Sequence, residues 1–203
     1  MARNTQPIVK RCRALGISPA VMGYTEKSKT GSTKRNPNGQ KRTKKSEYAT
    51  QLNEKQKVKF IYGILEKQFK MYYEKAAKAS GVTGEVLLST IERRLDNVVY
   101  RLGFATTRKE ARQLVNHGHY TVNGKKVNIP SYLIKAGDVI AVKEKSKQSP
   151  KFAALAEAMS SKGCPAWLEV DKANMSGKVV NLPAREDIDV PITEQLIVEL
   201  YNR

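Results

Sequence analysis

The sequence between residues 108 and 129 is RKEARQLVNHGHYTVNGKKVNI. Its first half, residues 108–116, places hydrophobic residues at helical spacing, so that they share one face of a helix. The hydrophobic period then changes to two, and residues 120–122 and 127–129 stand on either side of Asn123-Gly124. Asn-Gly accepts positive φ at both central positions of a hairpin turn. The stretch therefore predicts a short helix followed by an antiparallel β-hairpin.

Helical patterns precede this stretch, and short strands follow it. From Ser46 to Ala76, apolar residues recur at helical spacing, with Asn53 and Gln56 placed as a capping box. The other predicted elements are a second helical block at 86–102, caps at Thr106 and Thr107 for the helix of the opening stretch, a strand at 139–142, a helix at 148–165, strands at 166–170 and 178–182, and a helix at 192–201 capped by Thr193. Helices segregated from a small antiparallel sheet define the α+β class.

The charge of the chain is strongly positive and unevenly distributed. The chain has 37 Lys and Arg against 19 Asp and Glu, a net charge of +18. Residues 1–45 carry 12 basic residues and one acid, whereas residues 148–203 carry 6 basic residues and 8 acids. A positive field attracts polyanions and makes their binding sensitive to salt. We therefore expect the first three quarters of the chain to bind nucleic acid and the acidic end to bind protein.

Membrane and secretory classes are not supported by the hydropathy of the sequence. No run of about 18 apolar residues is present to span a bilayer, and no apolar stretch follows the basic start as a secretory signal requires. The Arg-rich start is compatible with a transit peptide in composition but lacks an apolar helical stripe. Cys12 and Cys164 are too few for a disulfide framework and fit a reducing cytosol.

Residues 1–45 are rich in Gly, Pro, Asn, Ser, Thr and Lys, and they sustain neither helical nor strand periodicity. Such a segment is expected to be disordered on its own, and its composition is also typical of a solvated linker. Its basic density, with Tyr24 and glycines between the cations, favours an extended arm that becomes ordered against RNA phosphates.

Three long stretches resemble one protein family. Residues 54–66 (EKQKVKFIYGILE) resemble the helical domain of bacterial-type small-subunit ribosomal protein S-four. Residues 92–104 (ERRLDNVVYRLGF), with 111–115 and 122–124, resemble the RNA-binding module named after that family, and residues 166–171 and 194–201 resemble its C-terminus. The similarity extends in order over the chain. It implies a basic extended arm at 1–45, an all-helical domain at 46–88 completed by 185–203, and an inserted RNA-binding domain at 89–184.

The resemblance also implies a function. It describes a structural constituent of the small ribosomal subunit that binds the 5′ domain of its rRNA directly and nucleates assembly there. It further implies a place beside the site where mRNA enters, contacts with ribosomal proteins S-five and S-three, a role in translational accuracy and, in some members, repression of their own operon. The expected location is the cytoplasm, in the small subunit of the ribosome, with no membrane and no small-molecule substrate as partner.

Two departures from the family pattern lie in the arm. Some members hold zinc there with four cysteines, whereas Cys12 has neither a second Cys nor any His before His117. Four tetrahedral ligands cannot be assembled from Cys12 alone, so we expect no zinc and no other cofactor. The family's Pro-Gly-Gln-His-Gly stretch appears as Pro37-Asn38-Gly39-Gln40-Lys41, without the histidine.

The candidate functional residues combine the arm, the cationic helix and the hairpin turn. Arg108, Lys109 and Arg112 are spaced to project together away from the apolar face of their helix. The candidates for rRNA binding are Arg3, Lys10, Arg11, Arg13, Lys34, Arg35, Lys45, Tyr48, Lys55, Lys59, Arg93, Arg94, Arg101, Arg108, Lys109, Arg112, His117, Lys125 and Lys126. The candidates at the mRNA site are Lys41, Arg42 and Lys44. The candidates for contact with a basic protein neighbour are Glu186, Asp187, Asp189, Glu194 and Glu199.

An enzyme and a duplex-DNA binder are the competing classes. His117 and His119 adjoin no cysteine or paired carboxylates, and no Gly-rich loop is followed by Lys-Ser or Lys-Thr. Pseudouridine synthases and tyrosyl-tRNA synthetases carry the same module, but they need a further catalytic domain of roughly 150–200 residues. Base readout in duplex DNA usually takes Asn, Gln and Arg converging on base edges, often from a symmetric dimer, whereas this helix carries mostly phosphate-type charge.

Overall fold

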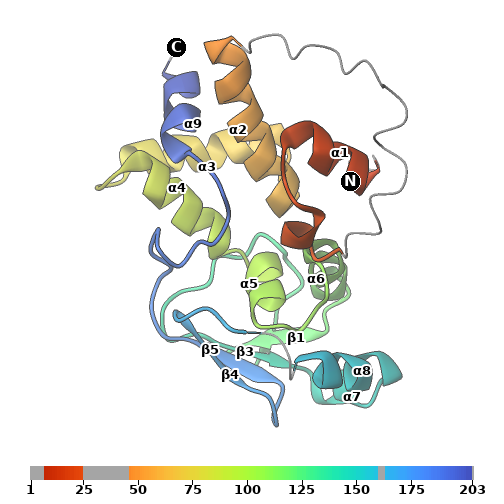
Figure 1. Ribbon diagram of the computed structural model, residues 1–203. Helices are drawn as coiled ribbons and strands as arrows, with labels where there is room; N and C mark the ends of the chain where they lie inside the picture. The colour runs from red at the N-terminus through yellow and green to blue at the C-terminus, as the bar shows by residue number, and fades with distance from the viewer. Residues whose placement is uncertain (1–6, 25–45, 160–162, 203) are drawn as a thin grey trace, which may run out of the picture.

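The computed structural model describes residues 7–24, 46–159 and 163–202, which form two layers (Figure 1). Helices occupy the upper layer, a five-stranded sheet forms the lower layer, and two short helices lie between them (Figure 1). The buried hydrophobic residues form two groups, which we call the helical cluster and the sheet cluster. This arrangement confirms the predicted α+β class.

The helical cluster is built from both ends of the chain. Its helices are α1 (Ile8–Leu15), the 3-10 helix η1 (Pro19–Met22), α2 (Glu47–Tyr62), α3 (Glu66–Lys78), α4 (Thr83–Glu92) and α9 (Glu194–Tyr201). Helix α9 packs against α2 and α4. Ile188, Val190 and Ile192, in the loop before α9, are buried in the same cluster. The C-terminal segment therefore completes a layer that the N-terminal helices begin.

Residues 8–15 and 19–22 are helical where the sequence predicts an extended arm. Cys12, Leu15, Ile17 and Met22 are buried in the helical cluster. The prediction was wrong here because two short helices expose few apolar positions to the core, too few to establish a period within a Lys- and Arg-rich stretch. Residues 1–6 and 25–45 of the predicted arm lie outside the described residues.

The predicted long helix after Ser46 is two helices, α2 and α3. The Ser46 Oγ accepts a hydrogen bond from the Ala49 N–H at 3.3 Å, so the cap is Ser46 and not the predicted capping box. Helix α2 ends at Gly63, whose φ of 65° is left-handed. Both helices pack on the same core, so the apolar spacing continues across the break and conceals it. Gly63 is the residue type that ends helices in this way.

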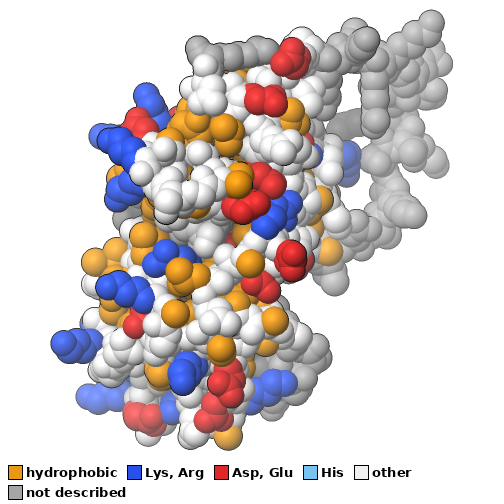
Figure 2. Space-filling view, turned by 90° about the vertical axis from the view of Figure 1, so that its left-hand side faces the viewer, with side chains coloured by type: hydrophobic (Ala, Val, Ile, Leu, Met, Phe, Trp, Pro, Cys, Tyr) orange, Lys and Arg blue, Asp and Glu red, His pale blue; other side chains and the backbone are white. Residues whose placement is uncertain are grey.

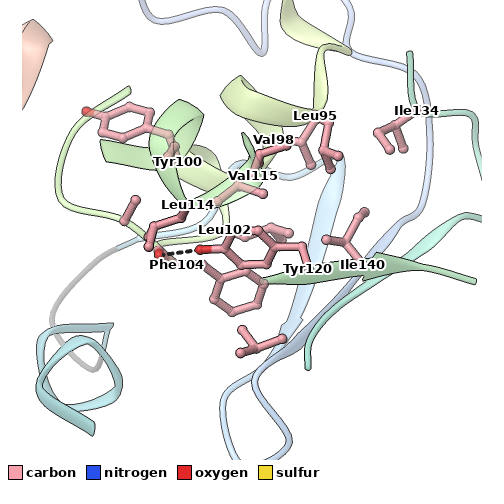
Figure 3. Packing of buried hydrophobic residues seen from close by; sticks show 14 of the residues in the cluster. Leu95, Val98, Tyr100, Leu102, Phe104, Leu114, Val115, Tyr120, Ile134 and Ile140 are labelled. Atoms are coloured by element: carbon pink, nitrogen blue, oxygen red, sulfur yellow. Dashed lines mark hydrogen bonds between the residues drawn. The ribbon is translucent and has the colours of Figure 1, made fainter. Parts of the chain in front are cut away.

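The sheet cluster lies between an antiparallel sheet and two helices. The strands are β1 (Tyr120–Val122), β2 (Lys125–Lys126), β3 (Val139–Val142), β4 (Leu168–Asp171) and β5 (Ser176–Val179), in the order β2-β1-β3-β5-β4. Helices α5 (Leu95–Arg101) and α6 (Arg108–Asn116) contribute the opposite side, and α7 (Glu144–Lys147) and α8 (Pro150–Met159) follow β3. Figure 3 shows Tyr120 reaching Phe104, whose carbonyl accepts a hydrogen bond from the Tyr120 hydroxyl at 2.9 Å.

The predicted hairpin is confirmed, with a different second strand. Val122 pairs with Lys125, and the turn residues Asn123 and Gly124 have φ values of 49° and 76°. The second strand is Lys125–Lys126 and not residues 127–129. The Asn123 side chain accepts a hydrogen bond from the Val139 N–H at 2.9 Å. This bond attaches the turn to β3.

The other predicted elements are present with shifted bounds. The helical block at 86–102 is divided into α4 and α5, because Arg94 forms a β-bridge with Leu133 between them. Helix α6 begins as predicted, since the Thr107 side chain accepts a hydrogen bond from the Glu110 N–H at 3.2 Å. Helix α9 and strands β3, β4 and β5 lie within a few residues of their predictions, whereas α8 ends at Met159, before the predicted end at residue 165. Thr193 precedes α9 but makes no side-chain cap bond.

Candidate nucleic-acid interface

Exposed cations gather where α6 meets the β1–β2 hairpin. Lys109, His117, Lys125 and Lys126 are exposed, and we call them the α6–hairpin surface. The aliphatic end of Lys126 lies over Gly118, so that a Cβ added at Gly118 would come within 2.3 Å of the Lys126 Cε. The hairpin therefore lies against the C-terminal end of α6, the helix whose first turn carries Lys109.

The two histidines have different environments. His117 is exposed, whereas His119 is half-buried, with its Nδ1 3.0 Å from the Ser146 Oγ and its ring against Phe152. Partial burial, followed by the nearby His117 and lysines, lowers the pKa of His119. The contacts with Ser146 and Phe152 hold the His119 ring against α7 and α8, whereas His117 is exposed.

Arg108 does not belong to the α6–hairpin surface. Its Nε donates to the Asn97 Oδ1 at 2.8 Å, and its Nη1 donates to the Val21 carbonyl at 3.0 Å. Its guanidinium lies over the rings of Tyr62 and Tyr100, 5.1 and 4.4 Å from their centroids. The prediction that Arg108 projects outward with Lys109 and Arg112 was wrong. Position 108 precedes the buried positions 111 and 115 by three and seven residues, so it lies on the apolar face of α6.

Arg94 is also an interior residue, only 1% exposed. It donates to both carboxylate oxygens of Asp96, at 3.1 and 2.7 Å, and to the Tyr72 hydroxyl at 2.9 Å. Arg112 reaches the same Asp96 at 3.4 Å, and Arg93 donates to a backbone carbonyl at 2.9 Å. The structure thus corrects the prediction for Arg94, whose guanidinium is held inside the protein. Arg93 and Arg112 are only partly exposed.

Glu92 is a fully buried carboxylate that receives three donors. The Tyr62 hydroxyl lies 2.5 Å away, Asn97 Nδ2 donates to it, and Arg101 pairs with it at 2.7 Å. Burial by itself opposes ionisation, but Arg101 and the other donors hold the pKa of Glu92 below its ordinary value. Arg101 also pairs with Asp189 at 2.7 Å. The structure therefore corrects the prediction for Arg101, which neutralises carboxylates within the chain.

Lys55 and Lys59, also predicted to bind rRNA, converge on Glu66. Their ammonium groups lie 3.0 and 2.5 Å from the two Glu66 oxygens. The Tyr201 hydroxyl donates to the same carboxylate at 3.0 Å. The two lysine side chains are 13% and 16% exposed. This cluster connects α2 with α3 and α9 and covers most of both lysine side chains, and their contact with rRNA stays a prediction.

Other predicted contacts lie on the surface of the helical cluster. Lys10 and Arg13 on α1 are exposed, Arg11 is half-buried, and the Tyr48 ring is 53% exposed at the start of α2. In Figure 2, Lys and Arg side chains follow one edge of the molecule from top to bottom, whereas Asp and Glu lie mainly toward the centre of the view. The predicted contacts outside the described residues are Arg3, Lys34, Arg35, Lys41, Arg42, Lys44 and Lys45.

The acidic residues near the C-terminus are partly matched within the chain. Asp189 pairs with Arg101, and Glu194 pairs with Arg185 at 3.1 Å. Arg101 is shared between Asp189 and the buried Glu92, and the Asp189 side chain is 74% exposed, so the contact of these acids with a basic neighbour stays a prediction. Asp187 accepts a hydrogen bond from the Ala184 N–H at 2.9 Å, and Glu199 accepts one from the Gln51 amide at 3.0 Å. Glu186 is exposed.

No metal-binding arrangement occurs among the described residues, since no three His, Cys, Asp or Glu side chains converge. Cys12 is fully buried, and burial raises the pKa of its thiol. In the same described part of the chain, no helix is long and apolar enough to cross a membrane.

The sequence analysis missed the residues that hold the buried arginines, namely Glu92, Asn97 and Tyr62. A signal was available for Glu92, which follows Leu88 by four residues and precedes Leu95 by three. Glu92 therefore lies on the apolar stripe of the helical block, and a charge on such a stripe requires a buried partner.

Two families match the chain. The family described as "Ribosomal protein S4/S9 N-terminal domain" matches residues 3–92, and the "S4 domain" family matches residues 93–140. A small ribosomal subunit protein uS4 of Agathobacter rectalis is 53% identical over 203 residues, covering all of both chains. That of Caldicellulosiruptor saccharolyticus is 55% identical over 208 residues, also at full length. That of Acetivibrio thermocellus is 64% identical over 165 residues, 81% of this chain and 79% of the relative. The chain belongs to the uS4 family, whose members are structural proteins of the small ribosomal subunit.

Proposed function

We propose that the chain binds the 5′ domain of small-subunit rRNA directly and nucleates the assembly of that part of the subunit. The observation that carries this proposal is the α6–hairpin surface. Lys126 lies over Gly118 just after α6, Lys109 is exposed in the first turn of the same helix, and His117 and Lys125 are exposed beside them in the sequence. A curved set of cations suits the phosphates of a folded RNA better than the base edges of a straight duplex.

The proposed mechanism is electrostatic and architectural. Cations on both clusters, such as Lys10 and Arg13 on α1 and Lys125 on β2, neutralise phosphates of RNA segments that would otherwise repel one another. No catalytic group and no cofactor take part in this mechanism. We place the protein in the cytoplasm, within the small subunit.

The test compares 5′-domain rRNA with duplex DNA of equal length at matched salt. We expect tighter binding to the rRNA, and equal affinity for both would contradict the proposal. Removing three cations together, in Lys109→Ala/Lys125→Ala/Lys126→Ala, should lower the slope of log K against log salt by about 2, at roughly 0.7–0.9 per phosphate. The control is Lys178→Ala, an exposed lysine on β5, two strands away from β1.

We further propose, from the family resemblance, contacts with mRNA where it enters the subunit and with ribosomal proteins S-five and S-three. A contribution to translational accuracy and repression of the protein's own operon belong to the same proposal. Glu186 supports a protein contact, because it is an exposed acid at the acidic end of the chain. Glu186→Lys should weaken incorporation of S-five into reconstituted subunits, whereas unchanged incorporation would remove Glu186 from this contact.

A further inference from the structure

Three arginines connect the sheet cluster to the helical cluster at three separate places. Arg94 donates to the Tyr72 hydroxyl of α3 at 2.9 Å. Arg101 pairs at 2.7 Å with Asp189, which stands between two residues buried in the helical cluster, Ile188 and Val190. The third connection is made by Arg108 and is described next.

Arg108 reaches the N-terminal side of the helical cluster. It donates to the Val21 carbonyl in η1 at 3.0 Å, and its guanidinium lies over the Tyr62 ring of α2. The three arginines thus contact α3, the C-terminal segment, and η1 with α2. Contacts with three different parts of the helical cluster restrain the orientation of the sheet cluster against it.

Arg94 and Arg108 are also anchored on their own side of the interface, and all three arginines are almost inaccessible. Arg94 is held by Asp96, and Arg108 by Asn97. Arg94, Arg101 and Arg108 are 1%, 9% and 7% exposed. An arginine that turned outward to a phosphate would leave a buried acid such as Glu92 without its positive partner, which is strongly unfavourable.

We propose that Arg94, Arg101 and Arg108 are positioning residues, which promote rRNA binding by fixing the sheet cluster against the helical cluster without touching phosphate. This inference rests on the proposed rRNA-binding function. Exposed cations lie on both clusters, for example Arg13 on α1 and Lys125 on β2. A fixed orientation allows one RNA to meet both sets without first ordering the protein, which increases affinity.

The first experiment replaces Arg108 by Lys, which keeps the charge but loses the planar group with donors in several directions. If Arg108 positions the clusters, Arg108→Lys and Arg108→Met should both weaken binding of 5′-domain rRNA about tenfold. In the RNA-free protein, hydrogen exchange of η1, α5 and α6 should become faster in both variants. If Arg108 instead touches phosphate, Lys should restore binding and exchange should not change, which would overturn the proposal.

Two controls separate positioning from loss of stability. Gly137→Ala strains the turn before β3, which makes none of the three arginine contacts, has a φ of +86° and has no atom near the added Cβ, so it should leave rRNA affinity unchanged. Lys109→Ala should flatten the salt slope without changing exchange in the RNA-free protein. Binding of wild type to rRNA and duplex DNA with equal affinity would refute the proposed function, whereas the exchange result concerns the interface alone.

A second variant keeps the proposal testable if Arg108→Lys does not fold. Tyr72→Phe removes only the hydroxyl that accepts from Arg94, and Tyr72 is 3% exposed, so RNA cannot touch it. We expect rRNA affinity to fall about threefold and exchange near residues 72 and 94–96 to rise. Unchanged affinity with faster exchange would show that the interface does not contribute to binding.

Discussion

At the scale of single residues, Gly23 marks a close backbone approach between the two clusters. A Cβ added there would lie 2.4 Å from the Thr106 carbonyl oxygen, and the φ of Gly23 is +78°. Gly63 has a similar φ of +65° but nothing within 4 Å of an added Cβ. We therefore expect Gly63→Ala to cost about 1 kcal/mol of unfolding free energy from backbone strain alone, and Gly23→Ala about 3 kcal/mol from strain and overpacking. Urea unfolding of both variants measures the difference, and equal losses would show that the chain shifts to relieve the clash.

Glu66 gives a prediction about acid stability. Partial burial opposes its ionisation, but hydrogen bonds from Lys59, Lys55 and Tyr201 outweigh burial and lower its pKa to about 2. An unfolded glutamate has a pKa of about 4.3. The stabilisation by this carboxylate is therefore complete above that value and disappears as the pH falls toward 2. We expect Glu66→Gln to cost about 1 kcal/mol at pH 7, since half of the side chain is exposed and screened.

The loss caused by Glu66→Gln should shrink between about pH 4.5 and pH 2, because the wild-type carboxyl itself becomes protonated there. Chemical denaturation of the wild type and of Glu66→Gln at both pH values measures this change in unfolding free energy. Glu74→Gln is the matched control, since the Glu74 ion pair with Lys70 spans 4.0 Å between exposed side chains. A loss that is independent of pH would mean that the Glu66 carboxylate acts by shape and not by charge.

Single cations were the least predictable part of the candidate site. Spacing along a helix indicates which residues share a face, but it does not indicate that Arg108 is turned inward over Tyr62 and Tyr100. That orientation depends on η1 and α2, which are distant in the sequence from α6. Lys125 and Lys126 were predictable as exposed because a two-residue turn fixes their place.

At the scale of elements, the start of α6 is held by its own residues. Thr107 accepts from the Glu110 N–H at 3.2 Å, and Glu110 accepts in return from the Thr106 N–H at 2.8 Å. Thr107→Ala should cost about 1 kcal/mol of stability, whereas Thr107→Ser should retain most of it. Thermal unfolding followed by circular dichroism distinguishes the two variants. Equal losses for Ala and Ser would assign the effect to the Thr107 methyl group, which lies 3.4 Å from the position of a Cβ at Gly23.

Elements with a local cause were predicted well, and those defined by distant contacts were not. The hairpin and the cap of α6 follow from residues within four positions of one another. The end of α2 also has a local cause, Gly63, but the apolar stripe continues across it and conceals it. The end of α4 lacks such a local signal, and the stripe continues across Arg94 as well. The β-bridge between Arg94 and Leu133 joins residues that are far apart in sequence, and it is what separates α4 from α5.

At the scale of the whole molecule, the contacts of Arg94, Arg101 and Arg108 between the helical cluster and the sheet cluster should make the two clusters unfold together. Trp167 is the only tryptophan of the chain and is buried in the sheet cluster, so its fluorescence reports on that cluster. The helical cluster contributes most of the long helices, so far-ultraviolet circular dichroism reports largely on it. In the wild type, we expect urea transitions of the two signals to coincide, as a two-state process requires.

Arg94→Met should separate these two transitions. The variant loses the bond to Tyr72 on α3 and leaves Asp96 with the more distant Arg112, so the sheet cluster is weakened while one connection is removed. A loss of roughly 1 kcal/mol of coupling, at a urea dependence of about 2 kcal/mol/M, separates the midpoints by about 0.5 M, with fluorescence changing first. Coincident transitions at a lower urea concentration would mean that apolar packing couples the clusters. In that case the arginines would add stability without setting the orientation in which the cations meet RNA.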